Sequence, residues 1–264
     1  MSICEELTSK AKTYEDAGSS EMAGRFYLKA AKCYEAREFF DKAAESYEAA
    51  SNAFMTAGMI SYGAKLLTIA ADTAIKMGDY DNYETLYGKA SAAYEVAVET
   101  ENDFRYLIDA AFCSLLAGDD NEANRLIRIA KEKLPDTYEP LINFVKQLAN
   151  MDFNTAYEMI REYDKYKIPK WLVNKIRDYA NNLLAAYIRN FLTVVEPAIS
   201  INAICDLTGE PKDRILEMVE DAVLNGLIPA KFDINTHELI VDKEHLNIDT
   251  LGTRPIQASD YPEE

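Results

Sequence analysis

The sequence predicts an all-α fold, a superhelix of stacked antiparallel helical hairpins that ends in a small winged-helix module. The phrase Lys-Ala-(Ala or Ser)-x-x-Tyr-Glu begins at Lys29, at Lys42 and again at Lys89, and such self-similarity is the signature of a repeat protein. Glycines that can end helices recur at steps of 20 and 40 residues, which indicates one helix per step and one hairpin per pair of steps. After Pro197 this pattern stops, so a second module is expected there.

Each helix is predicted from its apolar spacing and from the glycine that ends it. Small residues stand beside aromatic ones, so neighbouring helices can approach closely while the rings fill the gaps between them. The Gly-Asp pairs at 78–79 and 118–119 end one helix and cap the next. The expected helices cover 2–17, 19–37, 38–57, 59–77, a segment containing 83–98, 104–117, 121–134, a segment from about 137, 154–166 and 169–193.

The residues after Pro197 predict a winged helix whose first helix is the end of the 169–193 helix. Ser200 can cap a short helix over 201–207, a turn leads into an amphipathic helix that ends at Gly226, and a β-hairpin follows with strands at 228–232 and 238–241. Polar residues after Asp242 predict a flexible tail. The predicted domains are a helical solenoid over 1–181, a winged-helix cap over 182–242 and a tail over 243–264.

The composition favours protein binding over catalysis. Lys and Arg number 28 against 45 Asp and Glu, and the net charge of −17 repels nucleic acid. The two histidines, His237 and His245, lie in the predicted wing and tail, so no catalytic, metal or cofactor site is expected. The cysteines are far apart and form no CxxC pair, which predicts neither a disulfide framework nor a zinc site and indicates a reducing compartment. They are Cys4, Cys33, Cys113 and Cys205.

Neither a signal peptide nor a stretch of about 20 apolar residues is found. The expectation is a cytoplasmic protein with at most peripheral membrane contact.

Four segments resemble the closing third of the SNAP family, the soluble adaptors that attach the AAA ATPase NSF to SNARE bundles. They are Asp-Ala-Ala-Phe-Cys at 109–113, Leu-Pro at 134–135, Ile-Arg-Glu-Tyr-Asp at 160–164 and Lys-Trp-Leu at 170–172. The resemblance covers roughly the first 180 residues. It implies TPR-like repeats and a non-enzymatic adaptor in vesicle-mediated transport, which binds helical-bundle, SNARE-like proteins and recruits an AAA ATPase.

The sequence departs from the SNAP pattern in three places. An acidic cluster that contacts the ATPase in SNAP proteins corresponds here to Lys146, Ala149 and Asn150, and the turn at 18–20 is too short for the family's membrane-touching loop. Residues 224–233 are similar to the wing of a PCI domain, so the alternative is a PCI-like scaffold subunit of a multi-protein complex. If an ATPase is recruited, the nearest acidic residues for it are Asp260, Glu263 and Glu264 in the tail.

Two basic stretches are candidate partner-binding sites in this acidic chain. Residues 165–177 carry five cations before the next acidic residue, and they predict contact with an acidic partner, either a helical bundle or an anionic membrane. The alternative is a solvated segment with Trp171 buried in the repeat core. A second strip lies on the 121–134 helix, where solvation is again the alternative. The candidates are Lys165, Lys167, Lys170, Trp171, Lys175 and Arg177, together with Arg125, Arg128 and Lys131.

Overall fold

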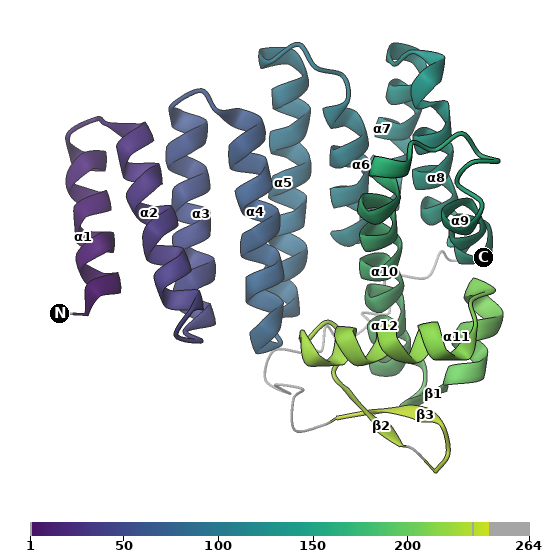
Figure 1. The fold of residues 1–264 in the computed structure, drawn as a ribbon. Coiled ribbons are helices and arrows are strands. Elements are labelled where there is room, and N and C mark those ends of the chain that lie inside the picture. Colours follow the sequence, from purple (N-terminus) through teal and green to yellow (C-terminus); the bar gives the residue numbers. More distant parts are fainter. Residues whose placement is uncertain (1, 234, 243–264) are drawn as a thin grey trace, which may run out of the picture.

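The computed structural model describes residues 2–233 and 235–242 and shows a row of antiparallel helices followed by a small mixed module (Figure 1). Helical hairpins stack side by side from the N-terminus, as predicted. The helices of the row are α1 (Ile3–Asp16), α2 (Ser20–Glu35), α3 (Phe40–Thr56), α4 (Ile60–Ala74) with the 3-10 turn η1 (Ile75–Met77), α5 (Tyr80–Thr100), α6 (Tyr106–Leu116) and α7 (Asp120–Lys133).

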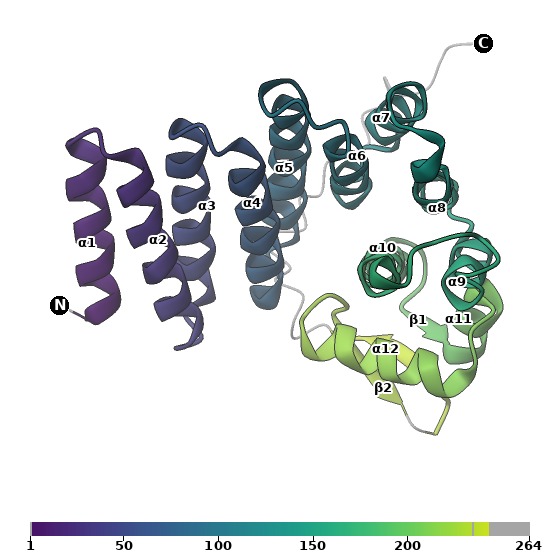
Figure 2. The ribbon, with the colours of Figure 1, turned by 45° about the horizontal axis from the view of Figure 1, so that its top comes forward.

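The later helices curl back, so that α10 lies inside an arc formed by α6, α7, α8 and α9 (Figure 2). Helix α10 contacts α6, α8, α9 and α12. The helix also continues without a break from residue 181 to 182, where the sequence predicts a domain boundary. These elements are η2 (Asp136–Tyr138), α8 (Glu139–Ala149), α9 (Phe153–Arg161), η3 (Lys170–Leu172), α10 (Val173–Asn190) and the π-turn η4 (Phe191–Val195).

Left-handed turns set the 20-residue spacing of the first helices. The glycines at 18, 58, 78 and 118 all have positive φ, as expected for residues that end a helix. Two of the 20-residue steps lack a glycine. Glu38, with φ 61°, makes the turn at the first, and at the second α5 runs on to a left-handed turn at Asn102, with φ 52°. Because Glu38 itself makes the turn, the predicted helix beginning at 38 starts instead at Phe40, just as α4 starts at Ile60 after Gly58.

Alanines and tyrosines form the core between neighbouring helices. The alanines at 23, 30, 31, 43 and 50 are fully buried, which allows close helix packing. A tyrosine hydroxyl then bonds a carboxylate of the preceding helix, at 2.7 Å from Tyr27 to Glu15 and again from Tyr47 to Glu35. The two pairs are one 20-residue step apart, so the sequence repeat is also a repeat of contacts.

A disulfide joins Cys4 of α1 to Cys33 of α2, with the two Cα atoms 5.5 Å apart. The prediction that no cysteines pair is therefore wrong, and the reducing compartment inferred from unpaired cysteines loses that support. Their 29-residue separation along the chain is closed by the hairpin, because antiparallel helices bring the start of one beside the end of the next.

The C-terminal module has the element order predicted for a winged helix, with one strand more than the sequence indicated. Ser200 caps α11 by accepting a hydrogen bond from the Ala203 amide at 3.1 Å. The missed strand, β1, pairs with β3 to give a three-stranded antiparallel sheet of order β1-β3-β2. The elements are β1 (Ala198–Ser200), α11 (Ile201–Thr208), α12 (Lys212–Leu224), β2 (Ala230–Asp233) and β3 (Glu238–Val241).

This module packs directly on the solenoid. A Cβ atom on Gly226 would lie 2.8 Å from the carbonyl oxygen of Ile75, so only glycine allows this close approach. Arg189 of α10 is buried, with its guanidinium 4.8 Å from the ring of Tyr80 and 5.1 Å from that of Tyr83. Cation–π contact with α5 therefore holds the end of α10 in place. Over the described residues, no helix is both long and apolar enough to span a bilayer.

Candidate partner-binding surface

A groove of about 570 Å³ runs between α4, α5, α6 and α10. Tyrosine rings from all four helices line it, together with the exposed Lys65 of α4 and Asp178 of α10. Tyr62 is exposed, Tyr106 and Tyr179 are half-buried, and Tyr87 and Tyr94 are buried. Aromatic rings with a polar tip are well suited to protein contacts. The tyrosines are Tyr62, Tyr87, Tyr94, Tyr106 and Tyr179.

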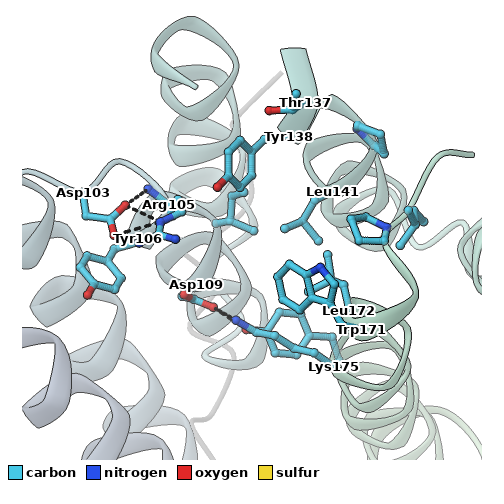
Figure 3. Close-up of a pocket in the computed structure, with 15 residues that line it drawn as sticks. Asp103, Arg105, Tyr106, Asp109, Thr137, Tyr138, Leu141, Trp171, Leu172 and Lys175 are labelled. Atoms are coloured by element: carbon cyan, nitrogen blue, oxygen red, sulfur yellow. Dashed lines mark hydrogen bonds and ion pairs between the residues drawn. The ribbon is translucent and has the colours of Figure 1, made fainter. Parts of the chain in front are cut away.

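A second cavity of about 400 Å³ opens beside the groove, between α6, the η2–α8 segment and the start of α10 (Figure 3). Four residues line both spaces, so the two form one continuous surface: Tyr106, Asp109, Lys175 and Tyr179. We call this second cavity the Trp171 pocket, after the indole at its mouth.

Asp109 of α6 fixes the wall shared by the two spaces. Its Oδ1 atom accepts hydrogen bonds from the Lys175 Nζ at 2.7 Å and from the Tyr179 hydroxyl at 2.6 Å. The Tyr179 ring stacks on Phe112 with the centroids 3.6 Å apart, and burial raises the pKa of Tyr179 well above its usual value. The tyrosine therefore stays a neutral donor, and α10 is held against α6 at a fixed position.

Asp72 of α4 carries the most perturbed carboxyl group in the groove. Its Oδ1 accepts a hydrogen bond from the Tyr87 hydroxyl at 2.7 Å, and desolvation between the groove walls raises its pKa to about 6. The residue is nevertheless open to solvent on one side. A proton equilibrium near neutral pH can therefore change the charge of the groove.

The structure divides the predicted basic segment at 165–177. Lys165 pairs with Glu158 and Glu162, and Lys175 pairs with Asp109. Within 2–233 and 235–242 neither Lys167 nor Lys170 has an ion pair, and both are exposed. Arg177 instead lines a separate cavity of about 340 Å³, between α9, α10 and α12.

Trp171 is 80% exposed. The interpretation that placed it in the repeat core is therefore wrong. Its neighbour Leu172 is the buried residue of that turn, because η3 directs one of two adjacent side chains inward and the other outward.

The strip predicted on α7 is only partly available. Arg125 is engaged by Glu95 of α5 and by Glu122 of α7, which leaves Arg128 and Lys131 as the exposed cations of the three. The proposed ATPase contacts Asp260, Glu263 and Glu264 lie outside the described residues.

The sequence did not indicate the residues that face Trp171 across its pocket. Ile108 and Asp109 lie on α6 and Tyr138 and Leu141 follow α7, so 30 or more residues separate them from Trp171. No local spacing connects them. The described residues contain no cluster of three or more histidine, cysteine or acidic side chains that could hold a metal ion.

The chain was compared with curated proteins and with models of protein families. A search of curated proteins found no match. The family model described as soluble NSF attachment protein, SNAP, matches residues 2–182, which is more than half of the 264 residues and includes every residue that lines the groove and the Trp171 pocket. The chain therefore belongs to the SNAP family.

Proposed function

We propose that this chain is a cytoplasmic, peripherally membrane-associated adaptor that holds a bundle of elongated, SNARE-like helices in the groove between α4, α5, α6 and α10, and that it recruits an AAA ATPase to that bundle. Membership of the SNAP family gives the chain a general adaptor role in SNARE- and NSF-related traffic, with proteins as its partners. SNAP proteins are adaptors rather than enzymes. The bundle, its position and the ATPase are the parts that we propose here.

One observation carries the proposal: the family match covers the whole groove, and the groove carries the exposed ring of Tyr62 and the exposed Lys65, which has no ion pair among the described residues, in a chain of net charge −17. Cations placed on one surface of an acidic protein direct acidic partners to that surface. For the bundle we include Lys65 of the groove and the exposed Arg128 and Lys131 of α7. For the ATPase, the acidic tail residues at 260, 263 and 264 remain the proposed contact.

Affinity purification of the tagged protein from its native cells, with ATP hydrolysis blocked, tests both parts. Membrane-anchored coiled-coil proteins and a hexameric ATPase should co-purify. Lys65→Glu in the groove should reduce recovery of the coiled-coil proteins, whereas Lys10→Glu on the exposed face of α1 should leave it unchanged. Equal recovery with both variants would refute the groove as the binding surface, and loss of the ATPase alone after changing the tail carboxylates would support the proposed ATPase contact.

A second candidate function rests on the C-terminal module, which lies outside the matched residues. Strand β2 is at an edge of its sheet, and an edge strand can pair with a strand of another protein. A PCI-like scaffold would use this edge to join other subunits. Co-purification of a fixed set of helical-repeat subunits without an ATPase would favour this second function.

A further inference from the structure

The Trp171 pocket has the properties of a preformed site for an apolar group. Its floor is made by buried side chains of two segments, Ile108 of α6 and Ile168 and Leu172 of the stretch before α10, and Leu141 closes one side. A volume of about 400 Å³ is within the range of ligand-binding pockets and large enough for one or two side chains. An indole 80% exposed at the mouth of such a pocket leaves a large apolar surface in water without an internal partner.

The walls of the pocket are fixed without any ligand. Arg105 and Asp103 form a paired salt bridge on one side, with Nε 2.9 Å from Oδ1 and Nη2 2.5 Å from Oδ2. On the other side Lys175 is held by Asp109 at 2.7 Å. Both pairs are drawn in Figure 3, where Trp171 faces the space between them and Leu141. Ordering these walls therefore costs little when a partner binds.

Two exposed lysines, without an ion pair among the described residues, stand within four residues of Trp171 in the sequence. Lys167 has φ 57°, and this left-handed turn lets the Ile168 amide bond the Tyr163 carbonyl at 2.8 Å while the Ile168 side chain enters the floor. Lys167 is left facing solvent, as is Lys170 one residue before Trp171. Within the described part of the chain neither amine has a carboxylate partner, so an acidic ligand can pair with both.

We propose that the Trp171 pocket binds a short acidic segment of a partner protein, which inserts one aromatic or leucine side chain beside Trp171 while its carboxylates pair with Lys167 and Lys170. This inference goes beyond the proposed function, because the ligand is a linear segment bound at the start of α10 and not a helical bundle held along the groove. The half-buried Glu158 and the exposed Glu162 and Asp164 lie nearby, and Lys165 pairs with the first two. These three acids and Lys165 together offset the charge of Lys167 and Lys170, so this corner lacks the net positive charge that an extended anionic membrane surface requires. A single flexible segment can place its carboxylates on the two lysines and avoid these acids.

Trp171 is the only tryptophan of the chain, so its fluorescence reports directly on the pocket. The probe is a synthetic ten-residue peptide with one central phenylalanine among aspartates and glutamates, and the matched peptide has alanine in its place. The phenylalanine peptide should shift the emission of the full-length protein to shorter wavelength and bind at least about tenfold more tightly than the alanine peptide. In a labelled-peptide assay, Trp171→Ala should weaken binding by a similar factor, and circular dichroism should be unchanged because the side chain is exposed.

Charge and alternative occupants are tested in the same assay. The double variant Lys167→Glu, Lys170→Glu should abolish the preference for acidic peptides, whereas Lys10→Glu should not. Equal binding of the phenylalanine and alanine peptides, or no binding of either, would overturn the proposal. So would an emission shift produced only by phosphatidylserine vesicles, which would make this corner a membrane contact. A red shift caused by Tyr261→Ser alone would show that the chain's own tail occupies the pocket and would equally overturn it.

Discussion

Breaking the Cys4–Cys33 disulfide should destabilise the first helical hairpin selectively. The bond closes a loop of 29 residues, and the loss of loop entropy in the unfolded chain then corresponds to about 3.6 kcal/mol at 25 °C. Helix α1 is the terminal helix of the row and packs mainly on α2. Since the units of a solenoid are stabilised chiefly by their nearest neighbours, we expect the loss to fall on α1 and α2 and to decrease toward α5.

Native-state hydrogen exchange measures this directly. Reduction, or the variant Cys33→Ser, should increase the exchange rates of the slow amides of α1 by a factor of up to several hundred, since each 1.4 kcal/mol corresponds to about tenfold. Cys205→Ser is the control, because Cys205 is a free thiol of the C-terminal module. Unchanged protection of α1 after complete reduction would show that the loop-entropy reasoning does not apply to this hairpin, and an equal loss of protection in α5 would show that the solenoid does not unfold locally.

Three further changes test the helical turns, the packing and the groove. Glu38→Gly should raise stability by about 1 kcal/mol in thermal unfolding, because glycine relieves the left-handed strain at φ 61°; a lower melting temperature would contradict this. Gly63→Ala should cost about 1–3 kcal/mol, since its Cβ would lie 2.3 Å from Met55 Cγ, whereas Gly88→Ala, with nothing nearer than 3.8 Å, should gain up to about 1 kcal/mol in helix propensity. In the folded protein the pKa of Asp72 is about 6, against an ordinary value of 3.8. Stability to urea should therefore fall as the pH rises from about 3.8 to about 6, by about 1 kcal/mol or less because the group is partly solvated. Asp72→Asn should remove that slope, and an identical slope in the variant would assign it to other groups.

The regular part of the fold was predictable because its signals are local. A glycine that ends a helix and an aspartate that caps the next are adjacent in sequence, and Asp79 and Asp119 do cap α5 and α7. Three features were missed because they depend on other parts of the chain, and one of them is the Cys4–Cys33 disulfide between neighbouring helices. Glu38 adopts a left-handed turn that its residue type does not favour, and β1 has only three residues and becomes a strand through its pairing with β3.

The candidate surface was predicted only in part, for a similar reason. The basic segment leads into α10 and stays a predicted contact, and sequence alone could not show which of its lysines are already paired. Lys175 is neutralised by Asp109, 66 residues earlier, whereas Lys170 is free among the described residues. The exposure of Trp171 also depends on where η3 packs. A tryptophan beside a leucine in a helical repeat favours burial of both, and the tertiary structure buries only Leu172.

Helix α10 links the two halves of the molecule physically. Its first turns supply Lys175 and Tyr179 to the groove and the Trp171 pocket, and its last turn supplies Arg189, buried against α5. The C-terminal module begins directly after α10, and its helix α12 packs on α10. The C-terminal module lies outside the matched residues 2–182. It therefore supports α10, which forms one wall of the groove within those residues. A partner that moves the module relative to α5 would also move that wall, so binding at the C-terminal sheet and binding in the groove should be energetically coupled.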